Sequence, residues 1–382
     1  MRILQISTAI EKKFGGPPNV VLNVQIELSK RKLESKTIIF GQVSHPYSPL
    51  QNLKRMHPNN LIIFKAKKSS EYGKLLKLRE FRKFIKIYRE SEIVIAHQLY
   101  NFQNVYLLIV LYFIKRPVVI IPHGTLTSVI RKNRRLKKKI ADKLIYNKLI
   151  NRSMAIGFSS QLEYEQLPER LKSKSLYFGI GIPARTPKSE LHPRENTGKN
   201  FLFIGRITPI KNLDLTIRGF FELKQRFPGI KLNVAGDGSN NYMNKLKSLV
   251  SELSLQDTVE FHGWAEDKYK DSLFKANDYA ILNSESENFS IAIAEAQCWG
   301  LPVLVTKNIG ISSQVNKFGS GVVIDHASVE NIYLGVTKLI SLDYSKLSES
   351  ALRCSEDLLW SKVIGQWLVN FEEILKRFKD ER

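Results

Sequence analysis

A chain of 382 residues with a hydrophobic fraction of 43% is long enough for two packed domains. Its two cysteines, Cys298 and Cys354, lie far apart, which excludes a disulfide framework and a Cys/His metal site and fits a reducing cytosol. The net charge of +23 is uneven, because residues 1–190 hold 36 Lys and Arg against 12 Asp and Glu, whereas residues 191–382 hold 23 against 24. The first half is therefore expected to meet an anionic partner: a nucleic acid, an anionic membrane surface or a phosphorylated acceptor.

Short apolar runs alternate with amphipathic segments along the first half. We expect strands at Arg2–Ser7, Thr37–Phe40, Leu61–Phe64, Ile93–Ala96, Val118–Pro122, Ala155–Phe158 and Ser175–Phe178, and helices at Val20–Lys32, Gly73–Tyr88 and Leu136–Asn151. The most apolar window, Val105–Ile114, is too short to span a membrane and is interpreted as a buried helix. The first residues predict a strand followed by a Gly-rich turn and not a signal peptide.

The same alternation continues in the second half. Strands are expected at Phe201–Ile204, Lys231–Ala235, Val259–Phe261, Tyr279–Leu282, Pro302–Val305 and Gly321–Val323, and helices near Leu213–Arg226, Asn241–Leu253, Tyr269–Ala276, Ile291–Trp299 and Val329–Ser341. Short apolar strands joined by helical crossovers predict parallel sheets with helices on both faces.

The fold class that follows is α/β, with two Rossmann-like doubly wound domains facing a cleft. We place an N-terminal domain at residues 1–181, a linker rich in Pro, Lys and Thr at 182–200, and a C-terminal domain at 201–360. Apolar residues recur at helical spacing through 361–382, which predicts a C-terminal helix that packs back on the domains.

Two cations follow the first strand of the second half, in the stretch Gly205-Arg206-Ile207-Thr208-Pro209-Ile210-Lys211. Ligands of open α/β sheets bind beyond the carboxyl ends of the strands, so Arg206 and Lys211 are placed to hold a diphosphate. A solvated basic loop is the structural alternative. Gly236-Asp237-Gly238 and the histidine of Phe261-His262-Gly263 are weak signals when taken alone.

The stretch "SESENFSIAIAEAQCWGLPVLVT", residues 284–306, places Glu287 and Glu295 with seven residues between them. Ser290 is expected to cap a helix that ends at Gly300, which puts Glu287 in the preceding loop and Glu295 within the helix. A carboxylate in a mostly apolar helix needs a partner or a ligand, and the vicinal hydroxyls of a ribose would suit it. A salt bridge in the core is the alternative.

These motifs together resemble the retaining glycosyltransferases of family four, also called glycosyl transferases group 1, which have the GT-B fold. The resemblance is dense in the C-terminal half and is also carried by Gly15-Gly16, by the strand that ends at His97, and by Pro122-His123-Gly124. Three departures, at Asn212, Pro183 and Asn288, leave the donor sugar open.

The resemblance implies a role for each matching residue. Arg206 and Lys211 would stabilise the leaving diphosphate, Glu287 would contact hydroxyls of the transferred sugar, and His123 would lie near the sugar and the acceptor. The donor would be bound by Glu295 at the ribose and by the remaining residues of the motifs: Gly16, Gly205, Gly236, Gly263, Trp264, Asn288, Phe289, Ser290 and Ile291.

The function expected from this resemblance is transfer of a hexosyl unit, with retention of configuration, from a nucleoside-diphosphate sugar to a saccharide or lipid-linked saccharide, in cell-surface polysaccharide biosynthesis. No cofactor and no metal are expected, because Arg206 and Lys211 supply the positive charge. A sugar-nucleotide epimerase of related fold is the first alternative, and a nucleic-acid-binding protein is a second, less favoured one. A nucleic-acid partner is not expected, since no known binding module is visible.

The densest run of cations predicts a second contact. We expect this run to bind anionic lipid headgroups, which would place the protein in the cytoplasm at the inner face of the cell membrane. The alternative is that the run is only the solvated face of a helix. The residues expected to touch the membrane are Arg131, Lys132, Arg134, Arg135, Lys137, Lys138 and Lys139.

Overall fold

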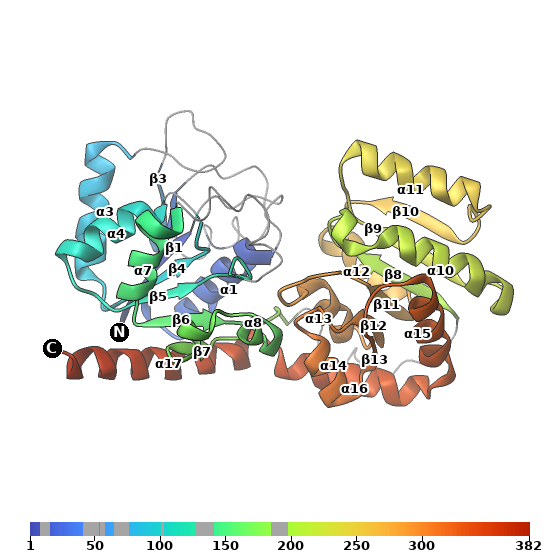
Figure 1. Cartoon of the computed structure of the whole chain (residues 1–382). Coiled ribbons are helices and arrows are strands. Elements are labelled where there is room, and N and C mark those ends of the chain that lie inside the picture. The colour runs from blue at the N-terminus through green and yellow to red at the C-terminus, as the bar shows by residue number, and fades with distance from the viewer. Residues whose placement is uncertain are drawn as a thin grey trace. The chain divides into compact units, whose positions relative to one another are not determined.

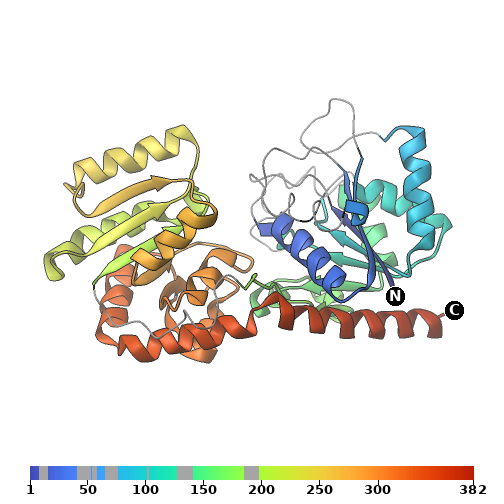
Figure 2. The ribbon, with the colours of Figure 1, turned by 180° about the vertical axis from the view of Figure 1, so that it is seen from behind.

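The computed structural model describes residues 1–7, 16–40, 53, 58–64, 76–100, 103–126, 141–184 and 198–382. The chain divides into two units, the first made of Met1–Gly181 with Trp360–Arg382 and the second of Ile182–Leu359. Each unit is built on one parallel sheet (Figures 1 and 2). Two doubly wound Rossmann-like domains were predicted from the alternating pattern, and this fold class is confirmed.

The first unit has a seven-stranded sheet in the order β3-β2-β1-β4-β5-β6-β7. Its strands are β1 (Arg2–Ser7), β2 (Glu34–Phe40), β3 (Leu61–Phe64), β4 (Ile93–His97), β5 (Val118–Ile121), β6 (Ala155–Phe158) and β7 (Ser175–Tyr177). Its helices are α1 (Gly16–Lys30), α3 (Leu78–Glu90), α4 (Gln103–Phe113), α7 (Asn147–Arg152), α8 (Gln161–Glu165), α9 (Glu169–Lys172) and α17 (Trp360–Asp380), with a 3₁₀ turn η2 (Pro58–Asn60) and a π-helical turn η3 (Asp142–Tyr146).

The second unit has a six-stranded sheet in the order β10-β9-β8-β11-β12-β13. Its strands are β8 (Asn200–Ile204), β9 (Lys231–Ala235), β10 (Val259–Gly263), β11 (Tyr279–Leu282), β12 (Val303–Thr306) and β13 (Gly321–Ile324). Its helices are α10 (Leu213–Arg226), α11 (Asn240–Glu252), α12 (Asp267–Ala276), α13 (Ile291–Cys298), α14 (Ser312–Phe318), α15 (Val329–Ser341) and α16 (Tyr344–Asp357), with a 3₁₀ turn η5 (Pro209–Lys211).

The predicted elements differ from the observed ones mainly at their ends. Helix α1 begins at Gly16 and not at Val20, because Pro17 and Pro18 suit the first turn of a helix, where a missing N–H costs little. Helices α14 and α16 were not among the predicted elements. The tail helix begins at Trp360 and belongs to the first unit, where Asn370 donates to the Tyr177 carbonyl across 2.7 Å.

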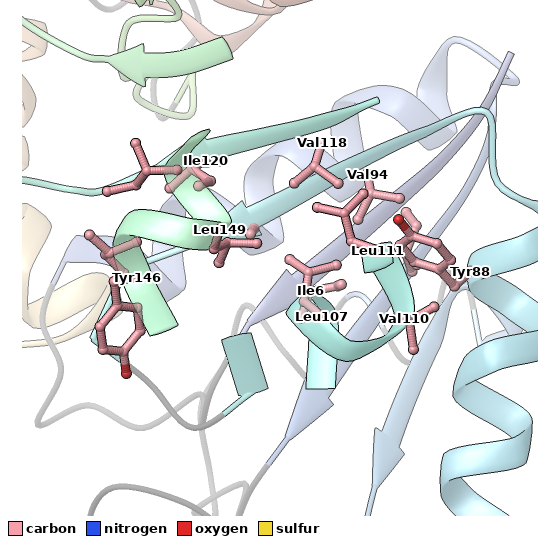
Figure 3. Packing of buried hydrophobic residues seen from close by; sticks show 14 of the residues in the cluster. Ile6, Tyr88, Val94, Leu107, Val110, Leu111, Val118, Ile120, Tyr146 and Leu149 are labelled. Atoms are coloured by element: carbon pink, nitrogen blue, oxygen red, sulfur yellow. The ribbon is translucent and has the colours of Figure 1, made fainter. Parts of the chain in front are cut away.

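Helices α3, α4 and α7 cover one face of the first sheet, whereas α1 and α17 contact each other on the opposite face (Figures 1 and 2). The apolar face of α4 supplies Leu107, Val110 and Leu111, which pack against strand residues such as Val94 and Val118 (Figure 3). These strands are buried on both faces, which explains their continuous apolar runs. Among the described residues, no helix has both the length and the apolar character that a bilayer span requires.

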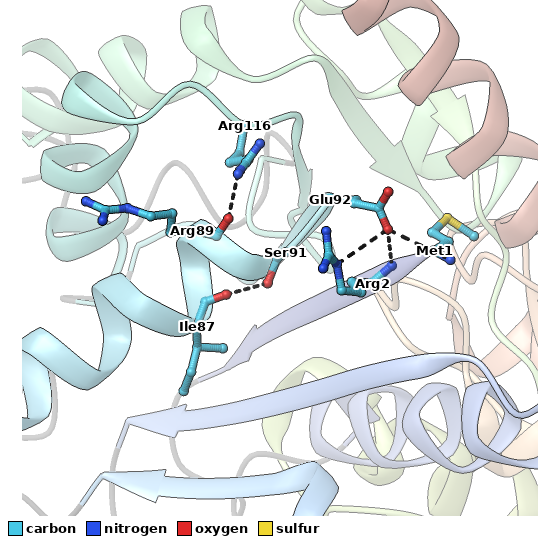
Figure 4. Close-up of polar contacts among 7 residues, drawn as sticks. All are labelled: Met1, Arg2, Ile87, Arg89, Ser91, Glu92 and Arg116. Atoms are coloured by element: carbon cyan, nitrogen blue, oxygen red, sulfur yellow. Dashed lines mark hydrogen bonds and ion pairs between the residues drawn. The ribbon is translucent and has the colours of Figure 1, made fainter.

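Polar contacts hold the amino ends of the first unit's strands. Glu92, just before β4, accepts a hydrogen bond from the Arg2 amide across 2.7 Å, and Arg116 donates to the Arg89 carbonyl across 2.5 Å (Figure 4). The Ser91 hydroxyl donates to the Ile87 carbonyl at the end of α3 across 2.7 Å. These contacts lie at the opposite end of the strands from the predicted ligand sites, so we assign them to the scaffold.

Candidate functional site

The order of each sheet reverses beside its first strand, and ligands of open α/β sheets bind at such a switch point. In the second unit, β8 lies between β9 and β11, so the loops that follow β8 and β11 are neighbours. The Glu285 amide donates to the Ile210 carbonyl across 2.8 Å, and the Asn212 side chain donates to the Asn283 carbonyl across 2.9 Å. These bonds tie the two predicted donor-binding loops to each other.

Lys211 and Glu287 form an ion pair across these two loops. Both side chains are largely buried, with exposures of 13% and 29%, so the pair is held in fixed positions. The backbone of Glu287 is also fixed, since its amide donates to the Asn308 carbonyl across 3.1 Å. Arg206, on the loop after β8, is exposed. Two residues from different sequence motifs therefore meet, and their pairing was not predicted.

The three predicted donor-binding glycines of this unit have different surroundings. A Cβ on Gly236 would lie 1.8 Å from the Gly205 carbonyl oxygen, so this glycine is required by the close approach of two loops. At Gly205 and Gly263, a Cβ would meet no described atom within 4 Å, and both have positive φ (147° and 68°). A ligand can therefore approach the backbone at Gly205 and Gly263, whereas the backbone of the neighbouring loop occupies that position at Gly236.

The loop that leads into α13 corrects one prediction. Ser290 does precede the helix, but its φ of 78° is left-handed and its hydroxyl makes no capping hydrogen bond. An N-cap needs extended backbone for its side chain to reach the following amides, and Ser290 lacks it. Phe289 is buried and its carbonyl accepts from the Ile311 amide across 3.0 Å, whereas Asn288 and Ile291 are half-buried.

Glu295 lies on the buried side of α13 with an exposure of 4%, and it forms an ion pair with Lys270 of α12. The structure thus shows the salt bridge that the sequence left as an alternative, and ribose binding by Glu295 stays a prediction. Lys270 was missed, because one lysine in an amphipathic helix that contains several carries no distinguishing signal.

Two residues near the end of β10 have separate partners. Trp264 has an exposure of 43%, and its indole donates to Glu266 across 2.8 Å. His262 contacts the Asn233 side chain at 2.9 Å and the Tyr269 hydroxyl at 3.1 Å, which satisfies both ring nitrogens. We therefore assign His262 to the scaffold, whereas Trp264 offers an indole surface to a ligand.

The first unit places His97 and His123 side by side at its own switch point. His97 ends β4 and His123 follows β5, and His97 Nδ1 lies 3.0 Å from His123 Nε2. Burial lowers the pKa of His123 to about 4 and the pKa of His97 well below 6.5, where the neighbouring His123 adds to the effect. Both rings are therefore neutral near pH 7. Gly16 begins α1, and Gly15 lies outside the described residues.

The predicted membrane-contact residues also lie outside the described part of the chain, which omits residues 127–140. The described residues hold no cluster of three or more His, Cys, Asp or Glu arranged to ligate a metal.

Residues 185–356 match the family described as glycosyl transferases group 1. The Ile182–Leu359 unit belongs to this family. The match covers nearly all of that unit, including the loops after β8 and β11. The resemblance inferred from the motifs is thereby confirmed at the level of the family.

Relatives of the chain include two curated enzymes. Mannosylfructose-phosphate synthase of Agrobacterium fabrum is 29% identical over 46% of this chain and 40% of its own length. D-inositol 3-phosphate glycosyltransferase of Mycolicibacterium smegmatis is 22% identical over 63% of this chain and 54% of its own length. The chain thus matches about half of the length of these curated relatives.

Among solved structures, Anabaena Alr3699/HepE in complex with UDP-glucose superposes with a TM-score of 0.73. It is 16% identical and the alignment covers 98% of this chain and all of that one. This likeness shows that the two proteins share the fold of paired Rossmann-like domains.

Proposed function

We propose that this protein is a retaining glycosyltransferase that moves a hexosyl unit from a nucleoside-diphosphate sugar to a saccharide or lipid-linked saccharide. The observation that carries the proposal is the Lys211–Glu287 ion pair at the switch point of the second unit. It sets a cation directly beside a carboxylate. The reacting part of a nucleotide sugar has the matching arrangement, since diphosphate oxygens adjoin the hydroxyls of the sugar.

The charge of this pair suits the bond that breaks. Negative charge grows on the leaving diphosphate, and a preoriented ammonium group there stabilises the transition state more than the bound donor. Arg206, exposed on the same loop, adds a guanidinium that can bind phosphate oxygens in a bidentate manner. These two residues perform the electrostatic role that a metal ion has in other transferases, so the proposal includes no cofactor.

The remaining donor contacts follow from the loops around this pair. The open faces of Gly205 and Gly263 admit the diphosphate and the nucleotide base, and Trp264 offers its indole beside the base. Glu295 would exchange its bond with Lys270 for the ribose hydroxyls, or would accept from both. The UDP-glucose bound by the Anabaena protein makes a uridine nucleotide the first donor to test.

A donor screen tests the proposal. The protein is incubated with a panel of nucleotide sugars and a membrane extract as the source of acceptor, and release of nucleoside diphosphate is measured. We expect release that depends on both the donor and the extract, together with an α-linked product from an α-linked donor. Release of a sugar-nucleotide epimer, with no transfer, would instead support the epimerase. The match to the glycosyl transferases group 1 family favours transfer.

We also propose that the first unit docks on the inner face of the cell membrane, which would bring it to a lipid-linked acceptor of cell-surface polysaccharide synthesis. Helices α3 and α4 expose large apolar side chains, with Leu78 at 66%, Tyr112 at 65% and Phe113 at 78%. The exposed residues of α3 also include five cations: Arg79, Arg82, Lys83, Lys86 and Arg89. Apolar side chains among cations are typical of surfaces that bind anionic lipid.

Vesicle binding tests this docking. Changing Arg79, Arg82, Lys83 and Lys86 of α3 to Gln should weaken binding to anionic vesicles, because each cation contributes about 1 kcal/mol near such a surface. A second variant, with the same change at Arg131, Lys132, Arg134 and Arg135, tests the sequence-based prediction separately. Raising the salt from about 0.1 M to about 1 M should weaken wild-type binding, since the Debye length falls from about 10 Å to about 3 Å. Unchanged binding by both variants would refute the docking proposal.

A further inference from the structure

A row of buried polar side chains crosses three neighbouring strands of the first sheet. Gln5 of β1, His97 of β4 and His123 after β5 are 0%, 0% and 8% exposed. His97 Nε2 lies 3.0 Å from Gln5 Oε1, and His97 Nδ1 lies 3.0 Å from His123 Nε2. Polar groups at such depth are costly unless they are paired, so this row indicates a purpose beyond packing.

The surroundings of Gln5 fix the direction of its amide. Its Nε2 donates to the Val21 carbonyl across 3.4 Å and to the Thr37 hydroxyl across 3.1 Å. The Thr37 hydroxyl in turn donates to Gln25 across 2.7 Å, so it can only accept from Gln5. The Gln5 carbonyl oxygen therefore faces His97 and accepts a hydrogen bond from it.

Proton positions then follow along the row. His97 donates from Nε2 to Gln5, and because it is neutral its Nδ1 is an acceptor. The His123 ring must donate its Nε2–H to that acceptor. A neutral His123 with hydrogen on Nε2 carries a lone pair on Nδ1.

Packing and backbone contacts hold the two rings in this arrangement. The rings of His97 and His123 are inclined by only 14° with centroids 5.3 Å apart, so they lie edge to edge along their hydrogen bond. The ring of Trp367 in α17 lies near His97, at a centroid distance of 6.4 Å. The turn at His123 and Gly124 has left-handed backbone, with φ of 50° and 78°. The buried Glu163 carboxylate accepts from the Gly124 amide across 2.6 Å, and it is anchored by the Ser159 amide across 2.8 Å.

We propose that Gln5 and His97 are positioning residues that hold His123 in the Nε2–H tautomer, so that its Nδ1 accepts a hydrogen bond from a hydroxyl group of the bound saccharide. The inference rests on the proposed function and on the family resemblance, which implies that His123 lies near the sugar and the acceptor. As a consequence, His123 selects substrates that have a hydroxyl group able to donate a hydrogen bond at that position. His123 does not itself donate a hydrogen bond to the substrate. Glu163 holds the backbone turn in which His123 lies.

The first test reads the tautomer directly. Two-bond ¹H–¹⁵N spectra of the full chain with ¹⁵N-labelled histidine distinguish a protonated Nε2 from a protonated Nδ1. We expect the Nε2–H form for both His97 and His123 in the wild type at neutral pH. A wild-type His123 with its proton on Nδ1 would overturn the proposal, whether or not any transferase activity is found.

Two matched variants test the part played by Gln5. Gln5→Met removes the acceptor of His97 at similar volume, so His123 is expected to show a mixture of tautomers. Gln297→Met, at a fully buried glutamine of the second unit that donates to Ser320, lies outside this polar row and should leave both tautomers unchanged. A His123 signal that stays entirely Nε2–H in Gln5→Met would contradict the role of Gln5. If Gln5→Met does not fold, His97→Phe removes the acceptor of His123 and is judged by the same criterion.

Kinetics with the donor found by the screen test the hydroxyl contact. A panel of donor and acceptor analogues, each with one hydroxyl replaced by fluorine, is assayed with wild type and Gln5→Met. Fluorine cannot donate, so one analogue should cost the wild type about tenfold in kcat/KM, the usual scale of one hydrogen bond, and should cost Gln5→Met much less. Equal losses in both proteins at every position would overturn the hydroxyl contact. Absence of transfer by the wild type would refute the proposed function and leaves the tautomer result intact.

Discussion

The two units share a sheet topology but place opposite kinds of chemistry at their switch points. Over the whole sequence, the first unit holds 39 Lys and Arg against 15 Asp and Glu, whereas the second holds 20 against 21. Yet the strongly basic unit has two neutral histidines at its switch point, and the nearly neutral unit has the Lys211–Glu287 ion pair.

This difference shows that the net charge of a domain does not predict the charge of its site. In the second unit, Lys211 and Lys270 are each held by a carboxylate, which fixes the position of the ammonium group before a phosphate arrives. In the first unit, burial removes charge from the histidines and leaves the direction of their hydrogen bonds as the controlled property. Among the described residues of this unit, exposed cations gather on helix α3.

The largest expected effect tests whether α17 supports the first unit alone. Trp367 is fully buried and packs against Phe178 at a ring-centroid distance of 4.9 Å, so Trp367→Ala should cost about 3–5 kcal/mol of unfolding free energy. Hydrogen exchange should show the loss in first-unit amides and no change in the second unit. Trp264→Ala, at an exposed tryptophan, is the control and should cost about 0.5 kcal/mol or less. Loss of protection in both units would mean that they do not unfold separately.

The next prediction concerns the ion pair of the second unit. Lys211→Ala should lower kcat by about 100- to 1000-fold and raise the donor KM much less, because its interaction strengthens as charge develops on the leaving group. Steady-state kinetics with the identified donor measure both constants. Lys346→Ala, which removes an exposed pair with Asp343, is the control and should leave both nearly unchanged. An effect confined to KM would mean that Lys211 binds only the ground state.

A pH titration addresses the neutral histidines of the first unit. Burial lowers the pKa of His123 from 6.5 to about 4. Between pH 6.5 and about pH 4, His123 is therefore protonated in the unfolded chain but neutral in the folded chain. The stabilising contribution is therefore complete above pH 6.5 and is lost as the pH falls towards 4, with His97 acting in the same direction. The other groups around the two histidines are the Glu163 carboxylate, which accepts from the Gly124 amide, and the uncharged side chains of Gln5 and Trp367, which contact His97.

Substituting Asn at position 123 isolates this contribution, since Asn does not titrate and tolerates left-handed backbone. In denaturant unfolding at about pH 7.5 and about pH 4.5, His123→Asn should lose about 2–3 kcal/mol less on acidification than the wild type. An identical loss in both proteins would show that His123 is protonated in the folded chain.

The smallest expected effect is that of a chelator. If Arg206 and Lys211 supply the positive charge at the diphosphate, an excess of EDTA should leave the transfer rate unchanged within error. Activity that is abolished by EDTA and restored by Mg²⁺ or Mn²⁺ would assign that role to a metal ion, and would then predict a smaller effect of Lys211→Ala.

The sequence by itself determined the fold class and the places of the donor loops. Runs such as Val303–Thr306 are apolar throughout because parallel strands are covered on both faces, and the alternation with helices leaves few other topologies. The strand-end positions of Arg206, Glu287 and His123 followed from the same periodicity, with the family resemblance supplying their proposed roles.

Only the tertiary structure decided which side chains meet. Lys211 and Glu287 are 76 residues apart, and Gln5 and His97 are 92 apart, so their contacts depend on the order of strands within each sheet. Periodicity indicates which face of a segment is buried but not which segment packs against it. For this reason, neither Lys270 as the partner of Glu295 nor Glu163 as the partner of the Gly124 amide could be predicted. For the same reason, the left-handed turn at Ser290 replaced the expected N-cap, because its φ is set by contacts of the adjoining loop with Asn308–Ile311 and not by the intrinsic preference of serine.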